Sequence, residues 1–191
     1  MSSKLDRRKK YTRMVLKESL ITLLKDKQIS SITVKELCEL ADINRSTFYS
    51  HYADQFDLLN KIEDEILEDM NQTLGSYNFN EEEEALQMTE KILEYVAANR
   101  DVCQTLLSEH GDPQFQQKVM RITYEFTMKN WMEIIKSDKK TSEYISLYVG
   151  SGSIHVIKNW LDNGMDMSPK EMAEIINNFT NNGLASLRSS S

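Results

Sequence analysis

Residues 44–52 combine two aromatic side chains at helical spacing with a row of hydrogen-bond donors. Phe48 and Tyr52 are four positions apart, so both would lie on the inner face of one short helix. The other face carries Arg45, Ser46, Thr47, Tyr49 and His51. A DNA-recognition helix needs this division, because one stripe packs on the protein while the other side chains reach base edges and phosphates. We therefore expect Arg45 to make a bidentate contact to guanine, and Thr47 and Tyr49 to contact a thymine methyl or a phosphate.

Two short helices joined by a tight turn must hold this segment in place. Thr33 and Glu36 have the spacing of a capping box, in which each side chain satisfies a backbone N–H at a helix start. That helix would end at Asp42-Ile43-Asn44, since Asp or Asn accepts the left-handed backbone of a tight turn. Asn44 would then be the N-cap of a helix over 45–51. With a first helix over 6–27 and another opened by Asp54, the pattern predicts a helix-turn-helix. The phosphate contacts expected in it are Thr33, Lys35, His51 and Tyr52.

The basic residues gather at the amino-terminal end of an acidic chain whose formal net charge is −7. Residues 1–60 hold 11 Lys and Arg against 8 Asp and Glu, a net of +3, while residues 61–191 hold 12 against 22, a net of −10. Seven basic residues lie in the first 17 positions: Lys4, Arg7, Arg8, Lys9, Lys10, Arg13 and Lys17. Such a run is typical of a solvated helix start or of a segment that faces a polyanion. Beside residues 44–52 we favour the second, with Arg7, Arg8 and Lys9 as phosphate contacts.

The composition favours a helical protein without a prosthetic group. The 191 residues are 40% hydrophobic and 28% charged, with six Gly and two Pro, so Gly-rich phosphate loops and all-β folds are disfavoured. No apolar run reaches roughly 18 residues and none follows the charged start, so we expect a cytoplasmic protein with no membrane segment. The two Cys and three His show no metal-ligand spacing, and no nucleophile elbow is present. We expect no metal, no cofactor, no catalytic residue and no enzymatic activity.

Residues 11–59 resemble the DNA-binding domain of TetR-family transcriptional regulators. The matching stretch runs from Ile32 to Tyr52, Ile-Thr-Val-Lys-Glu-Leu-Cys-Glu-Leu-Ala-Asp-Ile-Asn-Arg-Ser-Thr-Phe-Tyr-Ser-His-Tyr, followed by Asp57-Leu58-Leu59. The resemblance implies an all-α homodimer, with a helix-turn-helix DNA-binding domain in residues 1–53 and an effector-binding and dimerisation domain in residues 54–191. It also implies that Thr33 caps a helix near a phosphate and that Arg45, Ser46, Thr47 and Tyr49 face bases and phosphates. The chain departs from the usual pattern at Cys38 (commonly a small Ala), Asp42 (commonly Gly) and Gln55 (often Lys).

Helices are expected in the rest of the chain, over 83–99, 102–109, 113–137, 141–163 and 169–187. The helix over 141–163 is apolar on two faces, so one face is free to pack on a second protomer. With the last helix it would form a four-helix interface about a two-fold axis, as in TetR-family dimers. The interface residues expected are Ile145, Val149, Gly152, Val156, Trp160, Met172, Ile176 and Phe179. Residues 148–172 are also weakly similar to a TetR subgroup that includes regulators of dihydroxyacetone utilisation.

An effector pocket would lie among the middle helices, where Met and Tyr side chains recur. Met adapts to irregular shapes and Tyr adds a polar atom, as a small-molecule cavity requires. The candidate lining residues are Tyr95, Leu107, Met120, Tyr124, Met128, Trp131, Tyr148 and His155. Most such stripes are ordinary core, so we expect fewer than half of these residues to touch a ligand.

The function expected from these features is ligand-responsive regulation of transcription. The protein would act as a repressor, binding double-stranded palindromic DNA as a homodimer and responding to an unknown small-molecule effector. An alternative is a helical co-activator or adaptor that acts through protein contacts with little specific DNA binding. A third, a helical-bundle enzyme, is disfavoured by the missing catalytic clusters. Salt dependence separates the first two. For each phosphate contact in a specific DNA complex, the logarithm of the binding constant falls by about 0.9 when the salt concentration rises tenfold.

Overall fold

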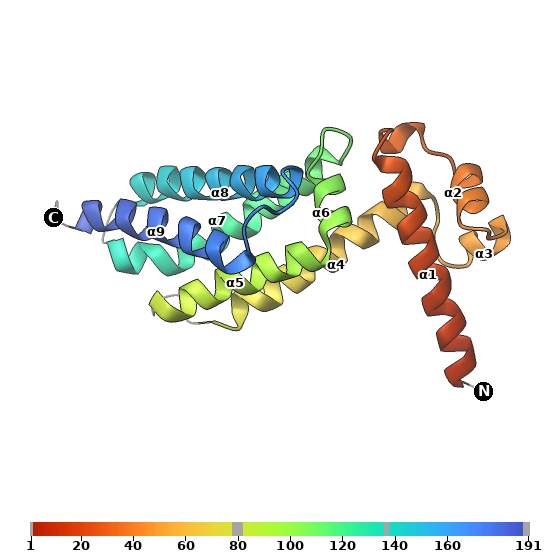
Figure 1. The fold of residues 1–191 in the computed structure, drawn as a ribbon, viewed down its shortest axis with the longest axis horizontal. Helices are drawn as coiled ribbons and strands as arrows, with labels where there is room; N and C mark the ends of the chain where they lie inside the picture. Colours follow the sequence, from red (N-terminus) through yellow and green to blue (C-terminus); the bar gives the residue numbers. More distant parts are fainter. Residues whose placement is uncertain (1, 78–81, 136–137, 189–191) are drawn as a thin grey trace. The chain divides into compact units, whose positions relative to one another are not determined.

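In the computed structural model, the backbone is described for residues 2–77, 82–135 and 138–188. Every regular element in these ranges is helical (Figure 1). The elements are α1 (Ser2–Leu24), a 3₁₀ turn η1 (Ile29–Ser31), α2 (Val34–Leu40), α3 (Arg45–Tyr49), α4 (Gln55–Gly75), α5 (Glu82–Ala98), α6 (Arg100–Leu106), α7 (Pro113–Ile135), α8 (Lys139–Asp162) and α9 (Pro169–Arg188). The all-α fold expected from the sequence is confirmed.

The chain forms two compact units. The first comprises Met1–Ile66 and Thr105–Phe115, and the second comprises Leu67–Gln104 and Gln116–Ser191. The first unit therefore extends beyond the boundary expected after residue 53. The reason is that the first half of α4 buries an apolar stripe in this unit, made of Leu58, Leu59, Ile62 and Ile66. Their three- and four-residue spacing places them on one helix face.

The core of the first unit holds the helix-turn-helix together. Leu16, Leu20 and Leu24 on α1 are fully buried, as are Leu37 on α2 and Phe48 on α3. Helix α2 contacts both α1 and α3. The apolar stripe of α1 and the aromatic residue of α3 thus fix the short helices, whose own length would not make them stable.

Local signals set the helix boundaries of the helix-turn-helix. Thr33 Oγ1 accepts from the Glu36 backbone N–H at 3.2 Å, while Glu36 Oε2 accepts from the Thr33 N–H at 2.9 Å. Asp42 has φ 51° in the turn, and the Asn44 side chain caps α3. These expectations are confirmed, although α3 ends at Tyr49 and the turn η1 was not expected.

The break before the last helix is also set locally. Gly164 has φ 81°, as a left-handed helix end requires, and Met165 follows with φ 59°. Ser168 and Glu171 form the expected capping pair, with Ser168 N–H donating to Glu171 Oε2 at 2.8 Å. The Trp160 indole N–H donates to the Met167 carbonyl at 2.9 Å, which ties the loop to the end of α8.

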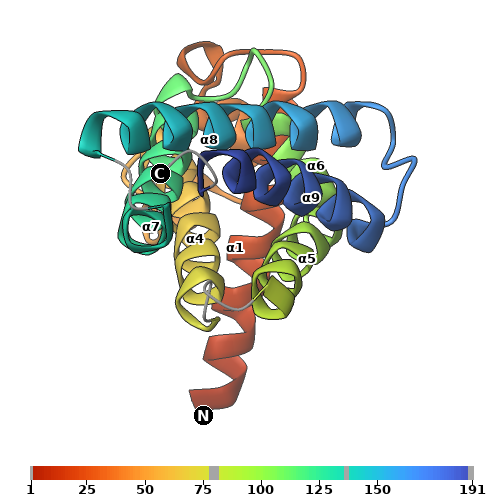
Figure 2. The same cartoon turned by 90° about the vertical axis from the view of Figure 1, so that its left-hand side faces the viewer.

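The second unit packs its long helices side by side. Helix α9 contacts α5, and α8 and α9 lie next to one another in both views (Figures 1 and 2). Helix α8 approaches α7 closely at Gly150, because a Cβ placed there would lie 3.4 Å from Thr123 Cγ2 and 3.5 Å from Met120 Cε. Small residues at such a position let two helix backbones come close.

Candidate nucleic-acid interface

Helix α3 is anchored by one aromatic residue and exposes the opposite face. Phe48 is fully buried, and its ring meets the Tyr49 ring edge-on at 5.5 Å and the Tyr52 ring at 5.8 Å. Arg45 and Ser46 are exposed, and Tyr49 is 57% exposed. In the part of the chain whose side chains are described, Arg45 has no carboxylate within 4.0 Å. The helix thus presents a free guanidinium and a phenol to solvent from a rigid base.

Asn44 organises the first turn of α3. Its Oδ1 accepts from the Thr47 backbone N–H at 2.8 Å, from Ser46 Oγ at 2.7 Å and from Thr47 Oγ1 at 2.9 Å. The hydroxyl protons of Ser46 and Thr47 therefore point to Asn44. In this arrangement both hydroxyl oxygens remain available as acceptors, which suits contact with base amino groups better than with phosphates.

The start of α2 presents Thr33 and Lys35. Both are exposed, and Lys35 Nζ lies 3.8 Å from Glu39 Oε1. Lys27 Nζ donates to Glu36 Oε1 at 2.6 Å. This bond, with the N–H and hydroxyl of Thr33, lowers the pKa of Glu36 to about 2. The carboxylate that completes the capping box is therefore ionised over the whole physiological range.

His51 and Tyr52 follow α3 and differ in exposure. Burial, together with the charges of Arg13 and Lys9, lowers the pKa of half-buried His51, so a neutral imidazole is favoured. Tyr52 is only 8% exposed, and burial raises its pKa. Lys61 Nζ lies 5.2 Å from the centre of its ring. Most of Tyr52 therefore belongs to the core, as its four-residue spacing from Phe48 predicts, and its expected phosphate contact stays a prediction.

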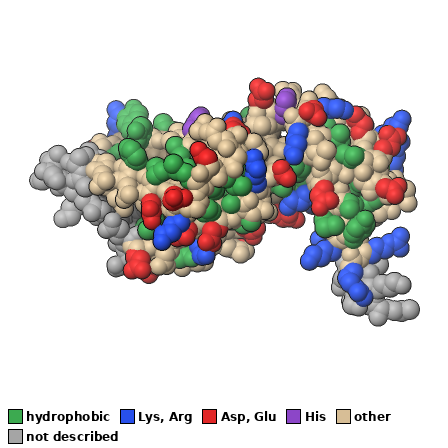
Figure 3. All heavy atoms as spheres, in the orientation of Figure 1, with side chains coloured by type: hydrophobic (Ala, Val, Ile, Leu, Met, Phe, Trp, Pro, Cys, Tyr) green, Lys and Arg blue, Asp and Glu red, His purple; other side chains and the backbone are tan. Residues whose placement is uncertain are grey.

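Arg7, Arg8 and Lys9 are exposed on α1. Among the described side chains, Arg8 and Lys9 have no carboxylate within 4.0 Å. Figure 3 shows Lys and Arg side chains gathered along this helix. The expected cationic segment is therefore present on the surface of the first unit.

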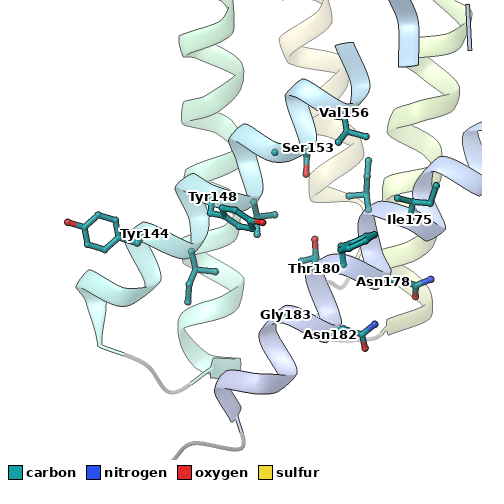
Figure 4. Close-up of a pocket in the computed structure, with 14 residues that line it drawn as sticks. Tyr144, Tyr148, Ser153, Val156, Ile175, Asn178, Thr180, Asn182 and Gly183 are labelled. Carbon is teal, nitrogen blue, oxygen red and sulfur yellow. The ribbon is translucent and has the colours of Figure 1, made fainter. Parts of the chain in front are cut away.

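A second surface lies between α8 and α9, where an apolar groove of about 890 Å³ opens to solvent (Figure 4). Six of the expected dimer residues line it: Ile145, Val149, Gly152, Val156, Ile176 and Phe179. Trp160 and Met172, which were expected with them, are 1% and 7% exposed. They are buried inside the unit and do not line the groove, which corrects the expectation for these two residues.

Two tyrosines of this surface were not among the interface residues predicted from the sequence. Tyr144 and Tyr148 line the groove and are 65% and 81% exposed. In Figure 4 the Tyr148 ring projects toward α9, whereas Tyr144 points away from it. The sequence pattern predicts Tyr148 in an effector pocket; in the structure it lines the groove between α8 and α9, and contact with an effector stays a prediction. Its position next to Val149, a residue of the expected dimer stripe, was the available signal.

The other candidate effector residues are not gathered in one unit. Tyr95, Met120 and Met128 are half-buried and Tyr124 is 37% exposed, all in the second unit. Leu107 is buried in the first unit. His155 is exposed, and its Nδ1 lies 2.8 Å from the carbonyl oxygen of Ser151 on its own helix, so it does not face an interior cavity. The side chain of Trp131 lies outside the described residues.

Two negative findings apply to the described residues. Within them, no three His, Cys, Asp or Glu side chains are placed to hold a metal ion. In the same part of the chain, no helix has the length and apolar character needed to cross a membrane.

Comparison with known proteins agrees with the geometry. Residues 83–182 match the TetR family model described as "Transcriptional regulator C-terminal region". The chain belongs to the TetR family of transcriptional regulators. Members of this family are not enzymes; they bind DNA operators, typically as homodimers with small-molecule effectors.

One relative and two solved structures illustrate the likeness. The chain is 39% identical over 64 residues to the "Uncharacterized HTH-type transcriptional regulator YxbF" of Bacillus subtilis, a match over 34% of this chain and only 16% of that relative. A TetR regulator from Streptococcus agalactiae superposes with a TM-score of 0.67 at 22% identity, over 94% of this chain and 99% of the other. The "Dihydroxyacetone kinase operon activator DhaS" superposes with a TM-score of 0.58 at 18% identity, over 91% and 96%. At these identities the two structures show a shared fold.

Proposed function

We propose that this protein represses transcription by binding an inverted-repeat operator as a homodimer, with α3 of each protomer in one major groove. The observation that carries the proposal is the exposed Arg45 and Tyr49 on a helix whose other face is fixed by buried Phe48. Arg45 reads a guanine, and the hydroxyl oxygens of Ser46 and Thr47 accept from base amino groups. Thr33, Lys35, His51 and the cations of α1 hold phosphates, which set position and add affinity.

The groove between α8 and α9 supports a second copy as its occupant. Tyr148 and Phe179 are 81% and 80% exposed, and large apolar side chains gathered on one face of a soluble unit mark an interaction surface. A two-fold axis through this face would bring the same helices of both protomers together as a four-helix interface. That symmetry requires two half-sites in inverted orientation.

A small-molecule effector completes the proposal. Its contacts come from α5 and α7, through Tyr95, Met120, Tyr124 and Met128, and its binding changes the separation of the two DNA-binding units through α4. An effector shifts this equilibrium only by its different affinity for the two states. Structures of the effector-bound and DNA-bound dimer test the mechanism: equal separation of the two recognition helices in both forms would contradict it.

Selection of bound sequences from a random duplex pool by the purified full chain tests the function. We expect an inverted repeat whose half-site contains a guanine, with binding that weakens linearly with salt on a log–log plot. Recovery of no common sequence at low salt would contradict the proposal and favour the adaptor function. Once an operator is known, a reporter gene placed downstream of it shows whether the protein represses or activates transcription. Higher reporter expression in the presence of the protein would contradict repression.

A further inference from the structure

Arg100 follows the end of α5 in the second unit and carries a charge that the described part of the chain does not neutralise. The residue is half-buried, and its Nε is out of contact with solvent. Among the described residues, no oxygen accepts a hydrogen bond from this Nε, and no carboxylate lies within 4.0 Å of the guanidinium. A buried cationic donor without an acceptor is costly, so the guanidinium needs a counterion.

The carboxylate of Asp162, at the end of α8, is already used by other residues. Gln104, one helical turn after Arg100 on α6, donates from Nε2 to Asp162 Oδ1 at 3.1 Å. Lys158 Nζ donates to Asp162 Oδ2 at 2.7 Å. The bonds from Lys158 and Gln104 hold the pKa of Asp162 below its ordinary value. Both carboxylate oxygens therefore have a donor, and neither is bonded to Arg100.

The loop after α8 passes the guanidinium at Gly164. A Cβ placed on Gly164 would lie 3.9 Å from Arg100 Nη2, which is the distance of ordinary van der Waals contact. Nη2 and Nε form one edge of a guanidinium, and their N–H groups point in the same direction. One atom of this edge is thus buried without an acceptor, and the other lies beside a residue that has no side chain.

The ligand that fits such an edge is an anionic oxygen group. A carboxylate or a phosphate presents two oxygens at the spacing of two guanidinium N–H groups and accepts both bonds at once. Because Nε is enclosed, the group must reach into the unit, which a small molecule can do and a folded protein surface cannot. All the residues around this edge, including Gln104, Asp162 and Gly164, belong to the second unit.

We propose that Arg100 binds an anionic oxygen group of the effector, a carboxylate or a phosphate, through Nε and Nη2. This inference rests on the proposed function and narrows the effector to organic acids and phosphate esters. Tyr95, one of the proposed effector contacts, lies five residues before Arg100, and its carbonyl accepts from Asn99 Nδ2 at 2.9 Å. The anionic end of the effector therefore lies at the C-terminal end of α5.

Nuclear magnetic resonance of the arginine Nε–H groups in the full chain tests the inference. A separate signal for each arginine is needed, because the cations of the first unit also attract anions. The probes are sodium acetate and sodium phosphate, titrated against sodium chloride at neutral pH and constant ionic strength. We expect a saturable shift of the Arg100 signal, which is identified by its loss in Arg100→Met. The signal of Arg121, an exposed arginine paired with Glu125, should not respond. Acetate alone would indicate an organic acid as effector, and phosphate alone a phosphate ester.

Urea unfolding of Arg100→Met gives a second readout, with Arg121→Met as the matched control. Methionine keeps the apolar part of the side chain and removes the guanidinium. In chloride, Arg100→Met should be at least as stable as the wild type, because a buried donor without an acceptor is removed. The probe anion should stabilise the wild type and Arg121→Met, and the part of this stabilisation due to Arg100 should be lost in Arg100→Met.

The outcomes separate the inference from the function on which it rests. If neither probe gives a saturable shift of the Arg100 signal, Arg100 binds no anion and the inference fails, whether or not an operator is selected. A loss of stability of Arg100→Met in chloride would also overturn it, because the guanidinium would then have a partner within the protein. If Arg100 binds the probe but the wild type selects no duplex, the anion site stands and the proposed function fails.

Discussion

The two units of this protein leave different chemistry on their surfaces. The first unit exposes Arg45 and a row of cations along α1, above a core fixed by Phe48. The second exposes Tyr148 and Phe179 beside an apolar groove. A cationic surface fits a polyanion, whereas an exposed apolar surface fits another protein. One chain therefore carries two chemically different surfaces, and under the proposed function changes in one should have effects that changes in the other do not reproduce.

The largest effect is expected from charging the apolar surface. Tyr148→Asp with Phe179→Asp should give a monomer, because burying two carboxylates at the interface is costly. Operator affinity should fall by roughly 10²–10⁴-fold, since two linked half-site contacts are replaced by one. Light scattering measures the mass of the protein in solution, and fluorescence anisotropy measures its affinity for the operator. Leu147→Asp is the control, because Leu147 is 54% exposed on the same helix and does not line the groove. A variant that stays dimeric would rule out this surface as the interface.

The next effect concerns base reading by the first unit. Arg45→Ala should cost about 1–3 kcal/mol on the operator, or roughly fivefold to 150-fold in affinity, and should relax the preference at one base pair. The mass of the protein in solution, measured by light scattering, should not change. Competition between operator and unrelated duplex measures the loss, with Arg121→Ala on α7 as the control, an exposed arginine paired with Glu125. Equal losses on both duplexes would show that Arg45 contacts only phosphate.

A smaller effect is expected from removing one helix cap in each unit. Asn44 caps α3 and Asp138 caps α8, each accepting from a backbone N–H of a threonine. Either substitution by Ala should lower the free energy of unfolding by about 1 kcal/mol, measured in urea. Only Asn44→Ala should also weaken operator binding, because Asn44 orients Ser46 and Thr47. An equal loss of operator affinity in both variants would contradict the idea that only the first unit contacts DNA.

The smallest expected effect concerns the pKa values of the two capping-box glutamates, Glu36 and Glu171. The pKa of Glu36 is lowered to about 2, chiefly by Lys27, whereas that of Glu171 is lowered by Ser168 alone. Because a lowered pKa favours the folded state when the carboxyl is ionised, this stabilisation is full above about pH 4.5 and is lost as pH falls through about 2. Carboxyl NMR titration of Lys27→Met should show a raised Glu36 pKa and an unchanged Glu171 pKa. An unchanged Glu36 pKa would assign the whole effect to Thr33.

Local structure was predictable wherever a few neighbouring residues decide it. The capping boxes at Thr33 and Ser168, the N-cap Asn44 and the left-handed residues Asp42 and Gly164 all follow from hydrogen bonds or backbone sterics within about four positions. For the same reason the exposed face of α3 could be assigned from its sequence. The groove between α1 and α4 could not be predicted from the sequence, because it brings Lys61 beside Lys10 and Arg13, which lie far from it in the chain.

Helix α8 shows where periodicity fails. Its sequence offers two apolar stripes, and periodicity does not decide which one is buried. In the structure its first half buries Ser142, Ser146 and Gly150, while Tyr144, Leu147 and Tyr148 stay exposed. Small residues allow the close approach to α7 at Met120 and Thr123, so the large apolar side chains remain on the outside.

By itself, the sequence determined the helical class, the helix-turn-helix with its caps, and the residues that face outward from α3, because each depends on interactions between near neighbours. Only the tertiary structure decided that Trp160 and Met172 are core residues, that Tyr148 belongs to the surface between α8 and α9, and that Lys10, Arg13 and Lys61 share one groove. These outcomes depend on which helices pack together, and residues distant in the chain determine that packing.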